Sequence, residues 1–97
     1  MGRNESRNQG TRIPSCLLDE KFRHFLLDFA IKKEGSKYSL AMKLGYVSVG
    51  SGKTVNEWYD GYAKIPFEKL QKLSFIVGIP IEEVLSHQVK EKVRPRI

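Results

Sequence analysis

The sequence contains one cysteine, Cys16, and no long apolar stretch. A single cysteine excludes an internal disulfide and is typical of a protein in a reducing compartment. The polar first residues do not resemble a secretory signal, and no segment approaches the roughly 20 apolar residues that a membrane span requires. We therefore expect a cytoplasmic protein with no membrane segment. Its 97 residues favour one small domain with little room for an enclosed catalytic cleft.

Groups that could carry catalysis or bind a metal are also scarce. Cys16, His24 and His87 are too few and too widely spaced for a zinc site. Residues 49–54 read VGSGKT and superficially resemble a phosphate-binding loop, but that loop needs a further glycine at position 47, where this chain has valine. Such a loop also follows a buried strand of a parallel sheet, for which the chain is too short. We predict no catalytic residues, no metal and no cofactor, and hence not an enzyme.

Positive charge is concentrated at the two ends of the chain. The net charge is +6, of which residues 1–13 supply +2 and residues 88–97 supply +3, so that residues 14–87 retain only +1. Residues 1–13 are also polar with few apolar side chains, which predicts a disordered basic arm. We expect a domain over residues 14–88, flanked by this arm and by a basic extension over residues 89–97. Such tails either contact phosphate groups or are simply solvated, so charge alone does not indicate a partner.

Apolar residues at spacings of three and four predict five helices separated by short turns. The first helix carries its apolar face on Leu18, Phe22, Phe25, Leu26, Phe29 and Ala30. The others are expected over residues 37–44, from 52 or 53 to 60, from 66 to 77 and from 80 to 85. Their inward residues are Leu40, Ala41, Leu44, Val55, Trp58, Leu70, Leu73, Ile76, Val77, Ile81, Val84 and Leu85. The predicted fold is an all-α, compact five-helix bundle.

Helix ends are marked by residues with the appropriate chemistry. Ser36 and Ser51 are expected to cap the second and third helices, because a serine hydroxyl accepts a hydrogen bond from an unpaired N–H of the first turn. Gly45 and Gly61 are expected to end the same two helices. Pro66 is expected to begin the fourth, where its missing N–H has no cost.

Three segments resemble the helix-turn-helix domain of the lambda-repressor-like family (the Cro/C1 or XRE type). Residues 36–45, SKYSLAMKLG, are similar to the second helix of that family, in which a capping Ser or Thr precedes Leu-Ala-x-x-Leu-Gly. Residues 54–61, TVNEWYDG, are similar to its recognition helix, and residues 65–85 match its fourth and fifth helices. The resemblance covers about residues 18–86. Three motifs in the right order are far more specific than one.

This resemblance implies binding to double-stranded DNA, with the third helix in the major groove. The residues that it places against base edges are Lys53, Thr54, Asn56 and Glu57. The residues that it places against the sugar-phosphate backbone are Lys37, Ser51, Tyr62 and Lys64. The core of the motif consists of Leu40, Ala41, Leu44, Val55 and Trp58. Ala41 is small because the two helices cross closely there. Each polar residue is equally compatible with an ordinary surface role, and a carboxylate at Glu57 would repel phosphate.

The chain departs from the family in the length of one turn. Between Gly45 and Trp58 it is about four residues longer than the usual spacing, so the turn of the motif is enlarged. The extra residues could bulge outward, extend a helix end over residues 46–49, or form a small hairpin over residues 47–55. These alternatives leave the base-reading residues open, although not the fold.

We predict a transcriptional regulator that binds DNA as a homodimer, because one helix-turn-helix unit buries too little surface for high specificity. The last helix, continued by Val89 and Val93, is one possible dimer surface. Two alternatives stay open. One is a protein–protein adaptor with the same fold, which the nearly neutral body and the acidic Glu57 and Asp60 favour. The other is a DNA-binding accessory module of a larger nuclease or recombinase.

Overall fold

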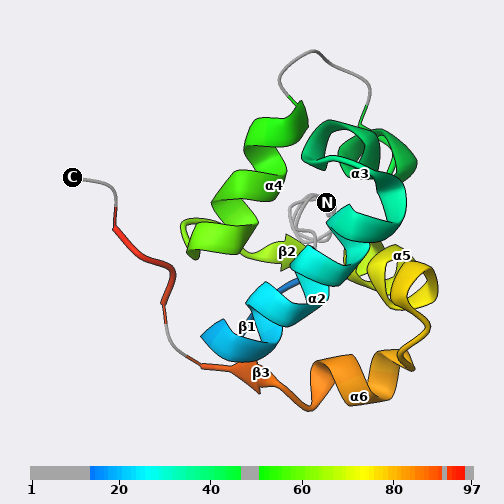
Figure 1. Ribbon diagram of the computed structural model, residues 1–97. Helices are drawn as coiled ribbons and strands as arrows, with labels where there is room; N and C mark the ends of the chain where they lie inside the picture. Colours follow the sequence, from blue (N-terminus) through cyan, green and yellow to red (C-terminus); the bar gives the residue numbers. More distant parts are fainter. Residues whose placement is uncertain (1–13, 47–50, 91, 96–97) are drawn as a thin grey trace, which may run out of the picture.

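Five helices make up most of the part of the chain that the structure describes. The computed structural model describes residues 14–46, 51–90 and 92–95. Its helices are α2 (Glu20–Glu34), α3 (Lys37–Lys43), α4 (Ser51–Asp60), α5 (Phe67–Val77) and α6 (Ile81–Leu85) (Figure 1). The helical bundle predicted from the spacing of apolar residues is therefore present. The basic arm over residues 1–13 lies outside the described residues.

A small sheet corrects the prediction that the fold is purely α-helical. Three short strands, β1 (Ser15–Leu18), β2 (Ile65–Pro66) and β3 (Gln88–Val89), form an antiparallel sheet in the order β2-β1-β3. The central strand pairs Cys16 with Ile65 at one end and Leu17 with Val89 at the other. Its residues from 16 to 18 are all buried, so β1 is covered on both faces. A continuous apolar run of this length does not reveal whether it forms a strand or a helix start.

The strands shift three expected boundaries. Leu18 belongs to β1, and α2 begins after Asp19, whose carboxylate accepts a hydrogen bond from Phe22 N at 3.1 Å. Pro66 lies in β2 and immediately precedes α5 instead of being its first residue. Val89 pairs with β1, so the last helix does not continue into residues 89–93, and the expected domain boundary at residue 88 falls inside β3.

The buried face of α2 also differs from the expected one. Arg23, Leu26, Leu27 and Ala30 are its buried residues, whereas the side chains of Phe25 and Phe29 are exposed. The buried positions follow the spacing 23, 26, 27 and 30, which defines one helical face. The buried face includes the charged residue Arg23, which the spacing of apolar residues alone does not indicate.

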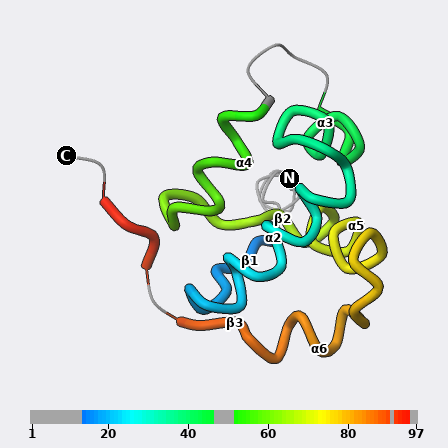
Figure 2. Tube along the Cα trace, viewed as in Figure 1, coloured from blue at the N-terminus to red at the C-terminus, as the bar shows by residue number. Residues whose placement is uncertain are grey.

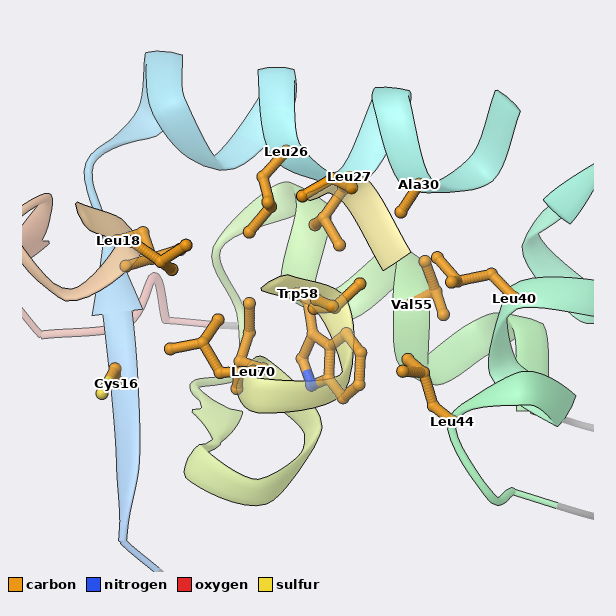
Figure 3. Packing of buried hydrophobic residues seen from close by; sticks show 14 of the residues in the cluster. Cys16, Leu18, Leu26, Leu27, Ala30, Leu40, Leu44, Val55, Trp58 and Leu70 are labelled. Atoms are coloured by element: carbon orange, nitrogen blue, oxygen red, sulfur yellow. The ribbon is translucent and has the colours of Figure 1, made fainter. Parts of the chain in front are cut away.

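The core lies between the helices and the sheet, with Trp58 near its middle. Figure 3 shows the Trp58 indole among leucines from several elements, with Leu70 and Val55 to either side. Each of the five residues expected beneath the helix pair is buried: Leu40, Ala41, Leu44, Val55 and Trp58. The cluster also includes β1 through Cys16 and Leu18 and α2 through Leu26, Leu27 and Ala30. One apolar core therefore joins β1 and β2 to every helix from α2 to α6.

Replacing Ala41 with leucine tests the tight packing of α3 on α4. Ala41 is fully buried, so a larger side chain must displace its neighbours, and overpacking of this kind costs typically about 1–3 kcal/mol of unfolding free energy. Urea denaturation would measure the loss. The matched control is Met42→Leu at the next position, which is exposed and should change stability little. Equal effects of the two substitutions would contradict close packing at Ala41.

The reactivity of Cys16 tests the burial of β1. Burial raises the pKa of the Cys16 thiol, and the nearby positive charge of Lys64 offsets only part of that rise. Because the thiolate is the reactive form, alkylation by iodoacetamide near neutral pH should be slower in the folded protein than in the urea-unfolded chain by about tenfold or more. Equal alkylation rates in the two states would show that β1 opens readily.

Candidate functional site

The first turns of α3 and α4 lie close together and share one exposed surface. A side-chain carbon added at Gly52 would lie 3.8 Å from the Tyr38 amide nitrogen and 3.9 Å from Lys37 Cβ. The Lys37 ammonium donates a hydrogen bond to Asn56 Oδ1 across the two helices. Ser36 caps α3 as predicted, its hydroxyl accepting a hydrogen bond from Ser39 N at 3.0 Å. The helix pair is thus fixed at the end where α4 begins.

One side of α4 is buried and the opposite side carries polar groups. Val55 and Trp58 face the core, whereas the outer side carries Lys53, Asn56, Glu57 and Asp60, at the spacing of a single helical face. Lys53 and Asn56 are exposed, and Thr54 and Glu57 are half-buried. We call Lys37, Lys53, Thr54, Asn56 and Glu57 the α3–α4 face. The structure thus brings together all four residues predicted to read bases and one of those predicted to contact the backbone.

The α3–α4 face carries little net charge. Its two lysines, Lys37 and Lys53, are offset by Glu57 on the face and by Asp60 one turn further along α4. Attraction to a polyanion depends on net positive charge near the contact surface. Polar groups rather than a strong positive field therefore distinguish this surface.

The beginning of α4 lies next to a part of the chain that is not described. The helix begins at Ser51, one or two residues earlier than predicted. The predicted capping and backbone contact of the Ser51 side chain lie outside what the structure describes, as do residues 47–50. Because residues 51–55 are helical, the hairpin considered over residues 47–55 is wrong.

Tyr46 fixes the chain where it leaves α3. Its amide donates a hydrogen bond to Ala41 O at 3.0 Å, and its ring packs against Trp58 with centroids 6.0 Å apart. The Lys69 ammonium lies 4.7 Å from the centre of the ring. Burial raises the pKa of Tyr46, and the negative charge of Glu68 raises it further. The phenol therefore stays neutral, and its ring packs in the core where the chain leaves α3.

The two other residues predicted to contact the backbone lie at the far end of α4. Tyr62 and Lys64 follow the helix, and the part of α4 from Lys53 to its last residue, Asp60, is about 10 Å long. The Tyr62 ring is half-buried, with the Arg94 guanidinium 4.9 Å from its centre. Lys64 is exposed and close enough to Cys16 to influence its thiol. The structure therefore does not bring these two residues together with Lys37 and Lys53.

A buried arginine that sequence reasoning missed holds the end of α4. Arg23 of α2 is 7 % exposed. Its Nη1 donates to Leu18 O at 2.9 Å, and its Nε donates to Tyr59 O at 3.1 Å. Cationic donors stabilise the negative end of a helix dipole, and a buried charge needs such partners. Arg23 thus joins α2 and β1 to the last turn of α4.

His24 and Arg94 supply further donors at the same helix end. Tyr59 O accepts a hydrogen bond from His24 Nε2 at 2.9 Å, and Asp60 O accepts one from Arg94 Nη1 at 3.2 Å. The backbone amide of Arg94 donates to Gly61 O at 2.8 Å. Part of the predicted basic extension therefore packs on the domain. Its contacts are non-local, so helical periodicity could not indicate them.

Tyr59 links the outer part of the same turn to α2. Its ring stacks on His24 with centroids 4.1 Å apart, and its hydroxyl donates to Asp28 Oδ2 at 3.1 Å. Burial raises the pKa of Tyr59, and the hydrogen bond and negative charge of Asp28 raise it further. Both ends of α4 are thus tied to α2 or α3.

Comparison with protein-family models, with curated proteins and with solved structures found no match. Among the described residues, no group of three or more His, Cys, Asp or Glu side chains is arranged to hold a metal ion. Within the same ranges, none of the helices combines the length and the apolar character needed to cross a membrane.

Two glycine substitutions test how the two ends of α4 are held. Gly61 has φ +85°, and a Cβ there would lie 3.1 Å from Arg23 Nη2. Gly61→Ala should lower the unfolding free energy by about 1–3 kcal/mol, because the backbone is left-handed and a buried side chain must move. Gly52→Ala adds only ordinary contacts and should be neutral or stabilising by up to about 1 kcal/mol. Thermal unfolding would measure the change in stability of both variants. A larger loss for Gly52→Ala than for Gly61→Ala would contradict the close packing of Arg23 against Gly61.

Proposed function

We propose that this protein binds double-stranded DNA in a sequence-specific manner and regulates transcription, with the outer side of α4 in the major groove. The observation that supports this most is the α3–α4 face itself. A helix buried on one side presents a row of hydrogen-bonding side chains on the other, next to the first turn of a second helix. A major groove about 12 Å wide admits one such helix.

The side chains of the α3–α4 face have the chemistry that distinguishes bases. A lysine such as Lys53 donates to guanine O6 or N7, an asparagine such as Asn56 pairs with adenine N6 and N7, and a carboxylate such as Glu57 accepts from cytosine N4. The Lys37 ammonium already holds the Asn56 amide oxygen. That contact orients the amide. The Nδ2 group is left to donate to adenine N7, and the second lone pair of Oδ1 is left to accept from N6.

Contacts with the phosphate groups of the DNA supply the rest of the proposed affinity. The near-neutral face provides only two lysines for phosphate, so the positive charge at the chain ends contributes the larger electrostatic part. Lys92 is exposed and Arg94 packs at the end of α4, which places some of that charge beside the helix. A single unit of this size reads a short site, so we propose that two copies bind two half-sites about one helical turn apart.

Duplexes selected from a random pool and a fluorescence anisotropy titration test the proposal. Lys53→Ala should weaken binding to the selected sequence about 5- to 150-fold and relax the preference at one base pair, because one base contact is worth about 1–3 kcal/mol. The matched control is Lys21→Ala, which removes the same charge at an exposed position in the first turn of α2. No enrichment of any sequence, or an equal loss in the two variants, would overturn the proposal.

The salt dependence of binding tests the role of Lys37. If the Lys37 ammonium contacts a phosphate as well as Asn56, Lys37→Ala should reduce the slope of log affinity against log salt by about 0.9. Affinity should fall for both selected and unselected duplexes, in contrast to Lys53→Ala, and it should fall further for the selected ones because Asn56 also loses the contact that orients it. An unchanged slope would restrict Lys37 to positioning Asn56.

A protein–protein adaptor is the second candidate, and the charge balance of the α3–α4 face favours it. The two positive charges of Lys37 and Lys53 are balanced by the two negative charges of Glu57 and Asp60. Such a mixed surface suits a protein partner of mixed charge better than a uniform polyanion. In that case the titration would show no binding of duplex at any salt concentration. The same selection experiment therefore separates the two candidates.

A further inference from the structure

One phenylalanine projects almost entirely into solvent. The side chain of Phe75 on α5 is 88 % exposed, far more than Phe25 at 52 % or Phe29 at 37 %. Burying a phenylalanine side chain is favourable, and Phe75 forgoes that gain in the single chain. Isolated exposed apolar residues are common on proteins, so the surroundings of Phe75 decide whether it has a role.

Two apolar hollows flank Phe75, one on each side. The first, which we call the α3 hollow, has a volume of about 440 Å³ and is lined by Lys43, Glu68, Gln71, Lys72, Phe75 and Ile76. The second, the α6 hollow, has a volume of about 500 Å³ and is lined by Gln71, Ser74, Phe75, Gly78, Ile79, Pro80 and Ile81. Gln71 and Phe75, one helical turn apart, belong to both linings and form the ridge between them. A projecting ring beside a hollow is a self-complementary shape.

The charges on the two sides of this ridge have opposite signs. Exposed Lys43 borders the α3 hollow, together with Lys72. Glu68 also lies there, but its carboxylate is paired with Lys69 at 3.3 Å. Beyond the α6 hollow, Glu82 and Glu83 are exposed next to Ile81. The surface is therefore positive on one side of Phe75 and negative on the other.

From this shape and charge we infer that the α5–α6 surface around Phe75 binds a second copy of the same chain. A two-fold axis beside the ridge places Phe75 of each copy in the α6 hollow of the other, against Ile79, Pro80 and Ile81. The same operation brings the Lys43 side of one copy over the Glu82 and Glu83 side of its partner. Every contact occurs twice, as in an isologous dimer.

Phe75 is suited to the centre of such a dimer. An aromatic side chain that enters a pocket at the centre of a contact is the kind of residue that dominates binding energy. A stable interface buries about 800 Å² on each partner, so the contact must extend from Phe75 over both hollows. The charged residues beside the hollows then form the rim.

The proposed dimer does not depend on the proposed DNA binding. Figures 1 and 2 show α5 and α4 on either side of α2, and Lys37 and Lys43 lie at opposite ends of α3. The dimer surface and the α3–α4 face therefore share no residue. Sedimentation of the protein without DNA tests the dimer alone. Failure of the dimer and failure of DNA binding are therefore separate results.

Analytical ultracentrifugation of the full chain from micromolar to millimolar concentration tests the inference. The wild type should form dimers reversibly, and Phe75→Ala should weaken the association by about thirtyfold or more, as for a central hot-spot residue. Because Phe75 is exposed, the variant should keep the wild-type unfolding curve. The matched control is Phe25→Ala, which removes another exposed ring from α2 and should leave the association unchanged.

A charge-reversal cycle distinguishes this specific interface from non-specific association. Lys43→Glu and Glu83→Lys should each weaken the dimer about two- to fivefold, as expected for a rim ion pair, and the double variant should recover most of the loss. A monomer at every concentration, equal effects of the two phenylalanine variants, or no recovery in the double variant would overturn the inference. A monomer that instead binds a different protein through Phe75 would assign the surface to that partner and would also overturn it.

Discussion

The orientation of the exposed side of α4 depends on the burial of its other side. Val55 and Trp58 enter a core to which β1 and the helices from α2 to α6 all contribute. Apolar burial is non-directional, but a tryptophan surrounded by leucines allows few alternative positions. As long as Trp58 keeps its place, Lys53 and Asn56 must point away from the core. The polar α3–α4 face is therefore a consequence of packing.

Hydrogen bonds from charged groups also hold the last turn of α4. Unlike apolar packing, they require a particular direction between donor and acceptor. The guanidinium of Arg23 is buried and bonded to carbonyl oxygens of two different elements, Leu18 of β1 and Tyr59 of α4. A buried charge left without such partners would cost several kcal/mol, so these bonds define where the helix ends. Gly61 contributes because it lacks a side chain where Arg23 passes closest. The apolar core and the hydrogen bonds of Arg23 together hold α4 in its position.

The polar and apolar surfaces of the domain reach opposite ends of α3, with Lys37 at its start and Lys43 at its end. The α3–α4 face offers hydrogen-bonding groups for a nucleic acid, whereas the surface around Phe75 on α5 offers an aromatic ring and two apolar hollows. We propose that the first binds DNA and the second a further copy of the chain. Since the surfaces do not overlap, both contacts can form at once, and a two-fold dimer provides the symmetry that paired half-sites require.

The sequence by itself determined the helices, their order and most of the core. Periodic apolar residues and local signals such as Ser36 depend only on neighbours within one or two turns, so the α3–α4 pair and its exposed row could be predicted. Tertiary structure alone decided that Leu17 pairs with Val89, that Arg23 rather than Phe25 lies inside, and that Arg94 lies against the Tyr62 ring. Each of these depends on contacts between residues distant in the chain, whose energies no local pattern contains.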